Sequence, residues 1–326
     1  MRAVVTGGAG FIGSHLIEAL VAHGDDVICI ERPGASKRWI AGLPVAWEAI
    51  GLDDVGALRR LFRDADVVFH LAALTEAPAP ADFYAVNTEA TARVLQAAGD
   101  HNGSAPRVIF LSSIAATGPC RNGETLSPDS VPFPLSHYGN SKLLAEAVVH
   151  AYADRVPTTV IRFPSVYGPR ERGVLKFFRL VSRGAAITVG PWDRELSLIY
   201  VRDAVHGLIA AAITEDAVGR TYCLAHPETV TWRDFATVAG RVMGRNPILV
   251  SVPTWIARQI AVAAELCAWC RKRAAILNRE RVREISQQRW VCDPSRAMAE
   301  IGFRPTYPIA RGAAETAKWY RRMGWL

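Results

Sequence analysis

Apolar and polar positions near the start of the chain predict a strand, a helix and a second strand. Ala3–Thr6 form a short apolar run, and the glycine turn Gly7–Gly10 follows it. Apolar residues then recur at helical spacing from about Phe11 to Ala22, and Val27–Glu31 form a second apolar run. This order predicts a βαβ unit, in which a helix joins two parallel strands.

The alternation of strands and helices continues through the first half of the chain. Residues 65–73 and 107–113 are largely apolar runs with β-branched residues, which are typical of parallel strands. Helical patterns at Val55–Phe62 and Asn87–Ala98 precede and follow the first of these runs. We therefore predict the α/β class, with a doubly wound parallel sheet of Rossmann type, whose ligands bind beyond the carboxyl ends of the strands.

The glycine turn has the spacing of a dinucleotide-binding site. Gly7 permits the tight turn, Gly10 lets the backbone approach a pyrophosphate, and Gly13 allows the helix to pack closely on the strand. Glu31 ends the next strand, where its carboxylate can accept hydrogen bonds from ribose hydroxyls and repel a 2′-phosphate. We therefore predict NAD as the cofactor. The adjoining Arg32 could pair with a 2′-phosphate, which keeps NADP open.

The second half of the chain has a different pattern, a mixture of helices and short strands. The chain has 326 residues, more than the ~100–200 that are usual for one domain. We predict a dinucleotide-binding domain over residues 1–167 and a smaller α+β substrate-binding lobe over residues 168–326. Residues 197–212 are a candidate return to the first domain.

Composition excludes several other classes of protein. The formal charge is +7, but the arginines are spread along the chain without a nucleic-acid-binding motif, so we expect no nucleic-acid partner. The six cysteines are scattered, as reduced thiols usually are, and no histidine has metal-ligand spacing, so we expect no metal. The start of the chain lacks the features of a signal peptide, so we expect a cytoplasmic protein.

One tyrosine and one lysine stand out against this composition. The chain has only five lysines, yet Lys142 follows Tyr138 by four positions. Random placement would give about 0.12 such pairs. Apolar positions at helical spacing follow Lys142, and residues four apart share a helix face. Ser113 ends a predicted strand 25 residues before Tyr138.

With the turn "TGGAGFIG", this Ser–Tyr–Lys spacing resembles the extended short-chain dehydrogenase/reductase superfamily, the NAD-dependent epimerase/dehydratase family. It is nearest in character to dihydroflavonol reductases and 3β-hydroxysteroid dehydrogenases. The segments "HLAA", "AVNTEAT", "LSSIAATG", "RFPSVYGP" and "LIYVRDAV" extend the resemblance along nearly the whole chain. The resemblance implies a homodimer, with Ser113, Tyr138 and Lys142 as catalytic residues. The implied cofactor site consists of Gly7, Gly10, Phe11, Ile12, Gly13, Glu31, Arg32, Leu52, Leu71, Ala72, Ala73, Asn87, Ser112, Tyr138, Lys142, Pro164 and Val166.

Physical chemistry suggests why a lysine is needed. A tyrosine hydroxyl has an ordinary pKa of about 10, and a fixed ammonium nearby should stabilise the phenolate and lower that pKa. Tyr138 would then act as acid and base. The same ammonium can hold ribose hydroxyls, which a planar guanidinium would do badly. Ser113 would hydrogen-bond the substrate oxygen and keep hydride and proton transfer aligned.

The sequence leaves the substrate open, because it departs from its relatives at several positions. Ile50-Gly51-Leu52 lacks an aspartate that contacts adenine in many of them. UDP-sugar enzymes typically have Phe-Asn at Pro164-Ser165, and an arginine for the diphosphate at Leu196. Three arginines could replace these phosphate ligands: Arg170, Arg172 and Arg194.

Five tryptophans in the second half favour an apolar pocket instead: Trp192, Trp232, Trp255, Trp269 and Trp290. We therefore predict an NAD(P)-dependent oxidoreductase that interconverts a small-molecule secondary alcohol and a ketone. The alternatives are a nucleotide-sugar 4-epimerase or dehydratase that retains NAD, and a nonenzymatic NAD(P)-sensing protein.

Residues 253–273 form an apolar stretch that Arg258, Gln259 and Glu265 interrupt. A membrane-spanning helix needs about 20 largely apolar residues, so this stretch is too short and too polar to span. The simpler hypothesis is an amphipathic helix that covers the substrate lobe. The alternative is peripheral membrane contact through residues 253–289, where a cluster of basic residues could meet anionic headgroups.

Overall fold

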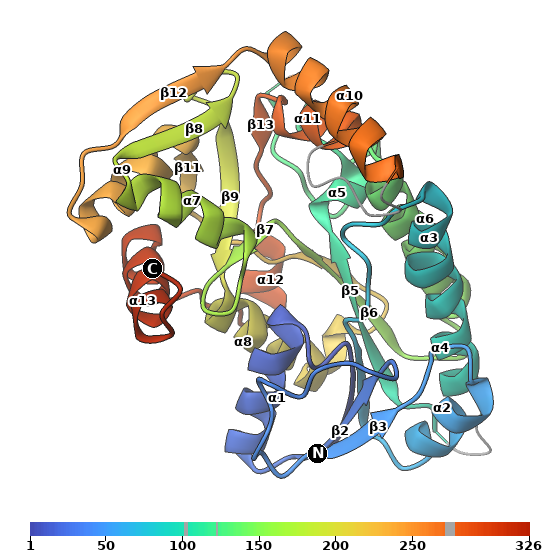
Figure 1. Ribbon diagram of the computed structural model, residues 1–326. Helices are drawn as coiled ribbons and strands as arrows, with labels where there is room; N and C mark the ends of the chain where they lie inside the picture. Colours follow the sequence, from blue (N-terminus) through green and yellow to red (C-terminus); the bar gives the residue numbers. More distant parts are fainter. Residues whose placement is uncertain (101–103, 122, 271–277) are drawn as a thin grey trace.

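The computed structural model describes residues 1–100, 104–121, 123–270 and 278–326 (Figure 1). Its main sheet has seven parallel strands in the order β10-β6-β5-β4-β1-β2-β3. The strands are β1 (Arg2–Thr6), β2 (Asp26–Glu31), β3 (Ala46–Ala49), β4 (Val67–His70), β5 (Arg107–Ser113), β6 (Thr158–Phe163) and β10 (Thr221–Cys223). This sheet confirms the predicted α/β class and its doubly wound order.

Helices cover both faces of the main sheet because successive strand residues point to opposite faces. Ala3 and Val5 of β1 pack with α1 (Phe11–His23) and α8 (Val201–Ile213). Val4 packs on the other side, with α2 (Val55–Phe62), α4 (Ala90–Gly99) and α6 (His137–Ala151). The buried strands are apolar on both faces, which explains why they read as continuous apolar runs.

Two predicted elements have different bounds in the structure. The apolar run 65–73 forms a strand only over Val67–His70, after which the chain leaves the sheet. The predicted helix Asn87–Ala98 begins earlier, with α3 (Pro80–Phe83) and a π-helical turn, η1 (Tyr84–Glu89), before α4. Asn87 lies inside that π-helical turn and is buried. π-Helical turns are frequently found at functional sites.

A second lobe is built around a small sheet in which β9 (Glu195–Tyr200) pairs with three strands. These are β7 (Ser165–Tyr167), β11 (Thr229–Thr231) and β13 (Arg289–Trp290). A separate ribbon pairs β8 (Ala185–Val189) with β12 (Ile248–Val252). The helices of this lobe are α7 (Gly173–Ser182), α9 (Trp232–Met243), α10 (Thr254–Cys270), α11 (Arg279–Ile285) and α13 (Ile309–Arg322).

The chain returns to the main sheet beyond residue 167. Helix α8 packs on that sheet, and β10 extends its edge, whereas β9 belongs to the second lobe. Short helices complete the chain at α5 (Ile114–Thr117), η2 (Glu215–Ala217) and α12 (Ser295–Glu300). The predicted boundary between the two domains, at residues 167 and 168, stays a prediction.

The tryptophans of the second lobe differ in exposure. Trp192 is buried, and Trp232 and Trp290 are half-buried beside the apolar cores, whereas Trp255 is 67% exposed. The side chain of Trp269 lies outside the described part. The segment predicted as an amphipathic helix forms α10, and among the described helices none is long and apolar enough to cross a membrane.

Candidate active site and cofactor site

The glycine turn brings three backbone segments into close contact. Gly7 has a φ of +72°, and a Cβ atom there would lie 2.8 Å from Cα of Ala72. At Gly13 a Cβ atom would lie 2.2 Å from the carbonyl oxygen of Gly7. Either side chain would force these segments apart. No side chain caps the start of α1 at Phe11 and Ile12, so its first N–H groups are available to a pyrophosphate. The turn therefore fits a dinucleotide.

Glu31 lies at the carboxyl end of β2 and faces the glycine turn. Its carboxylate accepts a hydrogen bond of 2.8 Å from the backbone N–H of Ala9. Burial raises the pKa of Glu31, while this hydrogen bond and the charge of Arg32 act in the opposite direction. Arg32 itself is exposed. The carboxylate is thus held beside the turn, where it would repel a 2′-phosphate.

We expect the protein to bind NAD about tenfold more tightly than NADP, because Glu31 is held beside the glycine turn and Arg32 is exposed to solvent. Glu31→Ala should narrow that difference, because it removes the repulsion and leaves Arg32. Calorimetric titration with both nucleotides measures this, with Glu315→Ala, an exposed change on α13, as the control. NADP binding that equals NAD binding would mean that Arg32 dominates.

Ser113 and Tyr138 meet where β5 ends and α6 begins. Ser113 caps α5 by accepting a hydrogen bond of 3.1 Å from the N–H of Ala115, and its hydroxyl lies close enough to Tyr138 to act on the pKa of that residue. Tyr138 is the second residue of α6, whose start Ser136 caps by accepting a hydrogen bond from Gly139. The structure therefore brings together the predicted serine and tyrosine.

Lys142 lies one helical turn after Tyr138 and is almost completely buried. Its Nζ atom donates a hydrogen bond of 2.6 Å to the carbonyl oxygen of Leu111 and lies 4.2 Å from the centroid of the Phe110 ring. Burial lowers the pKa of Lys142 to about 7, and the charge of Glu146 partly opposes this shift. The ammonium is therefore easily lost near neutral pH.

The prediction that Lys142 lowers the pKa of Tyr138 is wrong for the structure described here. Burial raises the pKa of Tyr138, and the nearby Ser113 only partly opposes that shift. Burial is thus the main cause of the raised pKa, and the ammonium of Lys142 binds the carbonyl of Leu111. The hydroxyl of Tyr138 is consequently neutral at ordinary pH.

Two residues predicted to contact the cofactor form hydrogen bonds with other protein groups. Asn87 accepts a hydrogen bond from the N–H of Leu74 at 2.8 Å, and its amide group donates to Leu74 and to Ser141. It thereby ties the loop after β4 to the helix that bears Tyr138. Ser112 donates its hydroxyl proton to Glu146. Both side chains thus join the elements that carry the candidate catalytic residues.

Glu146 and Arg162 form a buried ion pair that sequence analysis missed. Two hydrogen bonds join them, of 2.7 Å from Nη2 and 3.0 Å from Nε of Arg162. Glu146 follows Lys142 by four residues, so Tyr138, Lys142 and Glu146 share one face of α6. This four-residue spacing is the feature of the sequence from which Glu146 could have been identified. The carboxylate of Glu146 supplies the negative charge that partly opposes the lowering of the pKa of Lys142.

Helix α11 covers the start of α6 through two carboxylates that the sequence did not single out. Ser136 donates its hydroxyl proton to Glu284, and the backbone N–H of His137 donates to Glu280 at 3.0 Å. Tyr84 contacts the ring of His137 at 2.9 Å from the other side. The contacts with α11 join residues more than 140 positions apart, so local patterns could not reveal them.

The other predicted cofactor residues surround the same end of the main sheet. Gly10 precedes α1, Ala73 follows β4, and Leu52 is half-buried before α2. Leu71 and Pro164 are buried, while Val166 lies half-buried in β7.

Two of the three arginines considered for a phosphate already have protein partners. Arg170 donates to Ser14 at 2.9 Å and forms an ion pair with Glu18. Arg194 is 2% exposed and donates to Pro191 and Thr188. Arg172 is exposed, and its guanidinium lies 5.8 Å from a ring centroid of Trp325.

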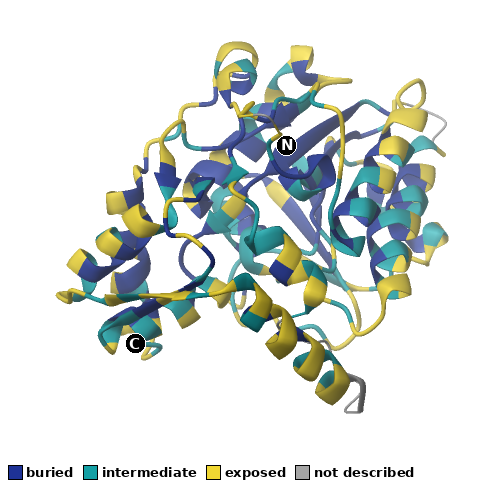
Figure 2. Cartoon of the chain, turned by 90° about the horizontal axis from the view of Figure 1, so that it is seen from above, coloured by how far each residue is buried: buried dark blue, intermediate teal, exposed yellow. Residues whose placement is uncertain are grey.

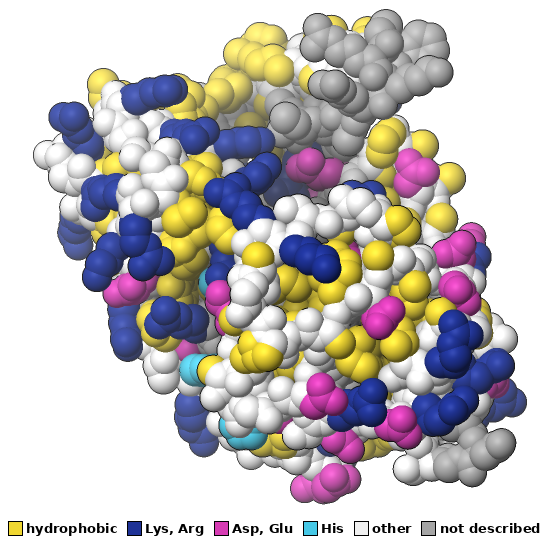
Figure 3. Space-filling model, turned by 60° about the horizontal axis from the view of Figure 1, so that its bottom comes forward, with side chains coloured by type: hydrophobic (Ala, Val, Ile, Leu, Met, Phe, Trp, Pro, Cys, Tyr) yellow, Lys and Arg dark blue, Asp and Glu magenta, His cyan; other side chains and the backbone are white. Residues whose placement is uncertain are grey.

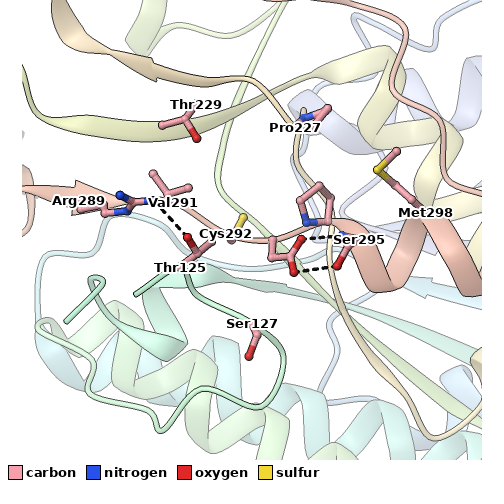
Figure 4. Close-up of a pocket in the computed structure, with 11 residues that line it drawn as sticks. Thr125, Ser127, Pro227, Thr229, Arg289, Val291, Cys292, Ser295 and Met298 are labelled. Atoms are coloured by element: carbon pink, nitrogen blue, oxygen red, sulfur yellow. Dashed lines mark hydrogen bonds between the residues drawn. The ribbon is translucent and has the colours of Figure 1, made fainter. Parts of the chain in front are cut away.

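A cavity of about 430 Å³ lies apart from these residues (Figure 4). Arg289 closes part of it by donating to Thr125 at 3.1 Å and by its ion pair with Glu195. Ser113, Tyr138 and Lys142 are absent from its lining. We therefore assign no substrate to it. Within the described residues, no cluster of His, Cys, Asp and Glu could hold a metal ion.

Comparison with known proteins places the chain in a family. The model of the NAD dependent epimerase/dehydratase family matches residues 3–225. The chain belongs to this family of enzymes, and its cofactor is NAD.

Individual relatives are named for different activities. A ceramide reductase of Caulobacter vibrioides is 28% identical over 99% of this chain and 95% of its own length. A UDP-N-acetyl-alpha-D-glucosaminuronate decarboxylase of Bacillus cytotoxicus is 32% identical over 64% of this chain and 70% of its own. The solved UDP-glucuronic acid 4-epimerase of Bacillus cereus, with UDP-glucuronic acid and NAD, has a TM-score of 0.77 at 22% identity. The match covers 99% of this chain and 100% of the epimerase chain, and it shows that the two proteins share a fold.

Proposed function

We propose that this protein exchanges a hydride between NAD and a secondary alcohol carbon, with Tyr138 as the acid and base. The observation that carries the proposal is the proximity of Ser113 to Tyr138, with the buried Lys142 one turn later on the same helix. These residues lie at the carboxyl end of the main sheet, the same end as the glycine turn. That is where doubly wound sheets bind their ligands.

Each residue has a distinct role in this proposal. When bound, NAD supplies the acceptor or donor of the hydride. Ser113 holds the substrate oxygen, and Tyr138 gives a proton to that oxygen or takes one from it. Lys142 holds ribose hydroxyls and contributes positive charge. Burial raises the pKa of Tyr138 and so favours its neutral hydroxyl, which is the form that donates a proton when a ketone is reduced.

The first candidate for the net reaction is epimerisation or dehydration of a nucleotide sugar, with NAD regenerated in each cycle. The family and several relatives support it better than they support a net interconversion of alcohol and ketone. The diphosphate would need a cation in the second lobe. Arg172 is exposed there and could provide it.

The second candidate is net reduction or oxidation of an apolar substrate, such as a lipid ketone of the ceramide type. Leu196 stands where the diphosphate-binding arginine was expected, and Arg170 and Arg194 have protein partners. The match to a ceramide reductase also extends over nearly all of both chains. These observations favour a site without a diphosphate.

Nucleotide analysis followed by a substrate screen separates the candidates. We expect purified protein either to retain NAD and epimerise or dehydrate a UDP-sugar, or to consume free NAD or NADH with a hydrophobic alcohol or ketone. NAD binding without turnover of any substrate in either class would favour the nonenzymatic alternative.

Two further expectations concern the state of the protein in solution. We propose a homodimer through α4 and α6, which lie side by side and include the half-exposed Leu144. Light scattering that shows a monomer at micromolar concentration would count against it. A cytoplasmic location also stays a proposal.

A further inference from the structure

Helix α10 exposes an apolar stripe that no described part of the chain covers. Trp255, Val262 and Leu266 are 67%, 38% and 62% exposed. With Gln259 they follow the helical spacing i, i+4, i+7 and i+11, so they lie on one face. The opposite face carries Ala257 and Ala261, both buried against Val282 of α11. Figure 2 shows α10 projecting from the body with exposed residues along its outer side.

The ribbon that leads into α10 is also apolar on its exposed face. Ile248 and Val250 of β12 are 72% and 40% exposed, and Ile187 of β8 is 44% exposed. Val250 is paired with Ile187, and residues two apart on a strand share a face. Only Pro253 separates β12 from α10, so Ile248, Val250 and the helix stripe belong to one continuous segment, and Ile187 is the partner of Val250 on the neighbouring strand. We call them together the apolar face.

Positive charge borders the apolar face. Residues 168–326 contain 25 Lys and Arg but only 14 Asp and Glu, whereas residues 1–167 have an acidic excess. Lys and Arg side chains gather over the second lobe in Figure 3. Arg183 and Arg245 precede the two ribbon strands and Arg258 lies on α10; all three are exposed and form no ion pair within the described residues. Glu265, the acidic residue of α10, is already paired with Arg279 at 2.7 Å.

We propose that the apolar face, with Arg183, Arg245 and Arg258, binds the surface of an anionic lipid bilayer. An exposed apolar stripe with flanking arginines suits the boundary between headgroups and acyl chains, where the helix lies in the plane of the membrane. The charge around it favours an anionic surface over a neutral one. Arg271, Lys272 and Arg273 follow α10 in the sequence but lie outside the described residues, so the proposal does not depend on their placement.

The proposed membrane face is connected to the candidate active site. Helix α11 packs on the inner side of α10 through Val282, and its Glu280 and Glu284 bind the start of α6. Tyr138 lies at that start. A bilayer under α10 would therefore be linked through α11 to the part of α6 that bears Tyr138, and membrane binding itself does not depend on the proposed reaction.

Cosedimentation with vesicles tests the proposal on the full chain. We expect the protein to bind vesicles of phosphatidylglycerol and phosphatidylcholine, to bind less at high salt, and to bind pure phosphatidylcholine weakly. The double variant Trp255→Ser/Leu266→Ser should bind at least about tenfold more weakly. Arg258→Ser should weaken binding chiefly at low salt. Ile213→Ser, at a residue 67% exposed on α8, is the matched control and should bind normally.

Two results would overturn the proposal. The first is failure to bind anionic vesicles at low salt, and the second is equal binding by the wild type and the double variant. If light scattering instead shows self-association that the double variant abolishes, while vesicles do not bind, the apolar face belongs to a second copy of the chain. Thermal melting confirms that each variant is folded.

Discussion

Tyr138→Phe should lower turnover by about a hundredfold or more while leaving NAD affinity nearly unchanged. The variant removes only the hydroxyl, whose pKa Ser113 influences, and the ring keeps its contact with Phe83. The loss should appear in kcat more than in KM, because the hydroxyl acts on the reacting oxygen. Steady-state kinetics with the substrate found in the screen, together with calorimetry for NAD, measures both quantities.

The control for that experiment is Tyr152→Phe, at the end of the same helix. Tyr152 packs on the core beside α4 and has no place in the proposed chemistry. Its removal of a hydroxyl should leave turnover close to that of the wild type. Near-normal turnover by Tyr138→Phe would show that another group carries the proton.

Lys142→Arg should also lower turnover by about a hundredfold, although it keeps a positive charge. The Lys142 side chain is 1% exposed, between the carbonyl of Leu111 and the ring of Phe110. A guanidinium is larger and planar, so it cannot occupy that space without moving its neighbours. We expect weaker NAD binding as well, because the ammonium is proposed to hold ribose hydroxyls.

Two further variants make the lysine result interpretable. Lys318→Arg, an exposed change on α13, should leave turnover and the melting temperature unchanged. Lys142→Met removes the charge at similar length, and it should keep the fold but lose turnover. If Lys142→Arg were folded and nearly as active as the wild type, the chemistry would not require a lysine.

Much of the fold could be predicted because it depends on local patterns. The strand Arg107–Ser113 and the helix Val55–Phe62 have the predicted bounds. The strand is buried over most of its length and has an apolar centre, Val108–Leu111, and Asp54 caps the helix where the apolar period begins. Tyr138 and Lys142 could be identified because helical spacing places them on one face.

The parts that sequence analysis missed depend on contacts between distant segments. Arg162 on β6 forms an ion pair with Glu146, and residues of α11 in the second lobe form hydrogen bonds with Ser136 and His137. The direction of the Lys142 ammonium is another such property. The carbonyl that it binds belongs to Leu111 on β5, and the pKa of Tyr138 is raised by burial, which residue spacing along the sequence does not reveal.

A single-turnover measurement tests the central proposal most directly. Protein loaded with NAD is mixed with alcohols of both candidate classes, UDP-sugars and lipid alcohols, and formation of reduced nicotinamide is followed by its absorbance. The account predicts that one class reduces the bound cofactor in the wild type, and that Tyr138→Phe slows this step by about a hundredfold or more. Reduction at the same rate in both proteins, or no reduction by either class in folded, NAD-loaded wild type, would contradict it.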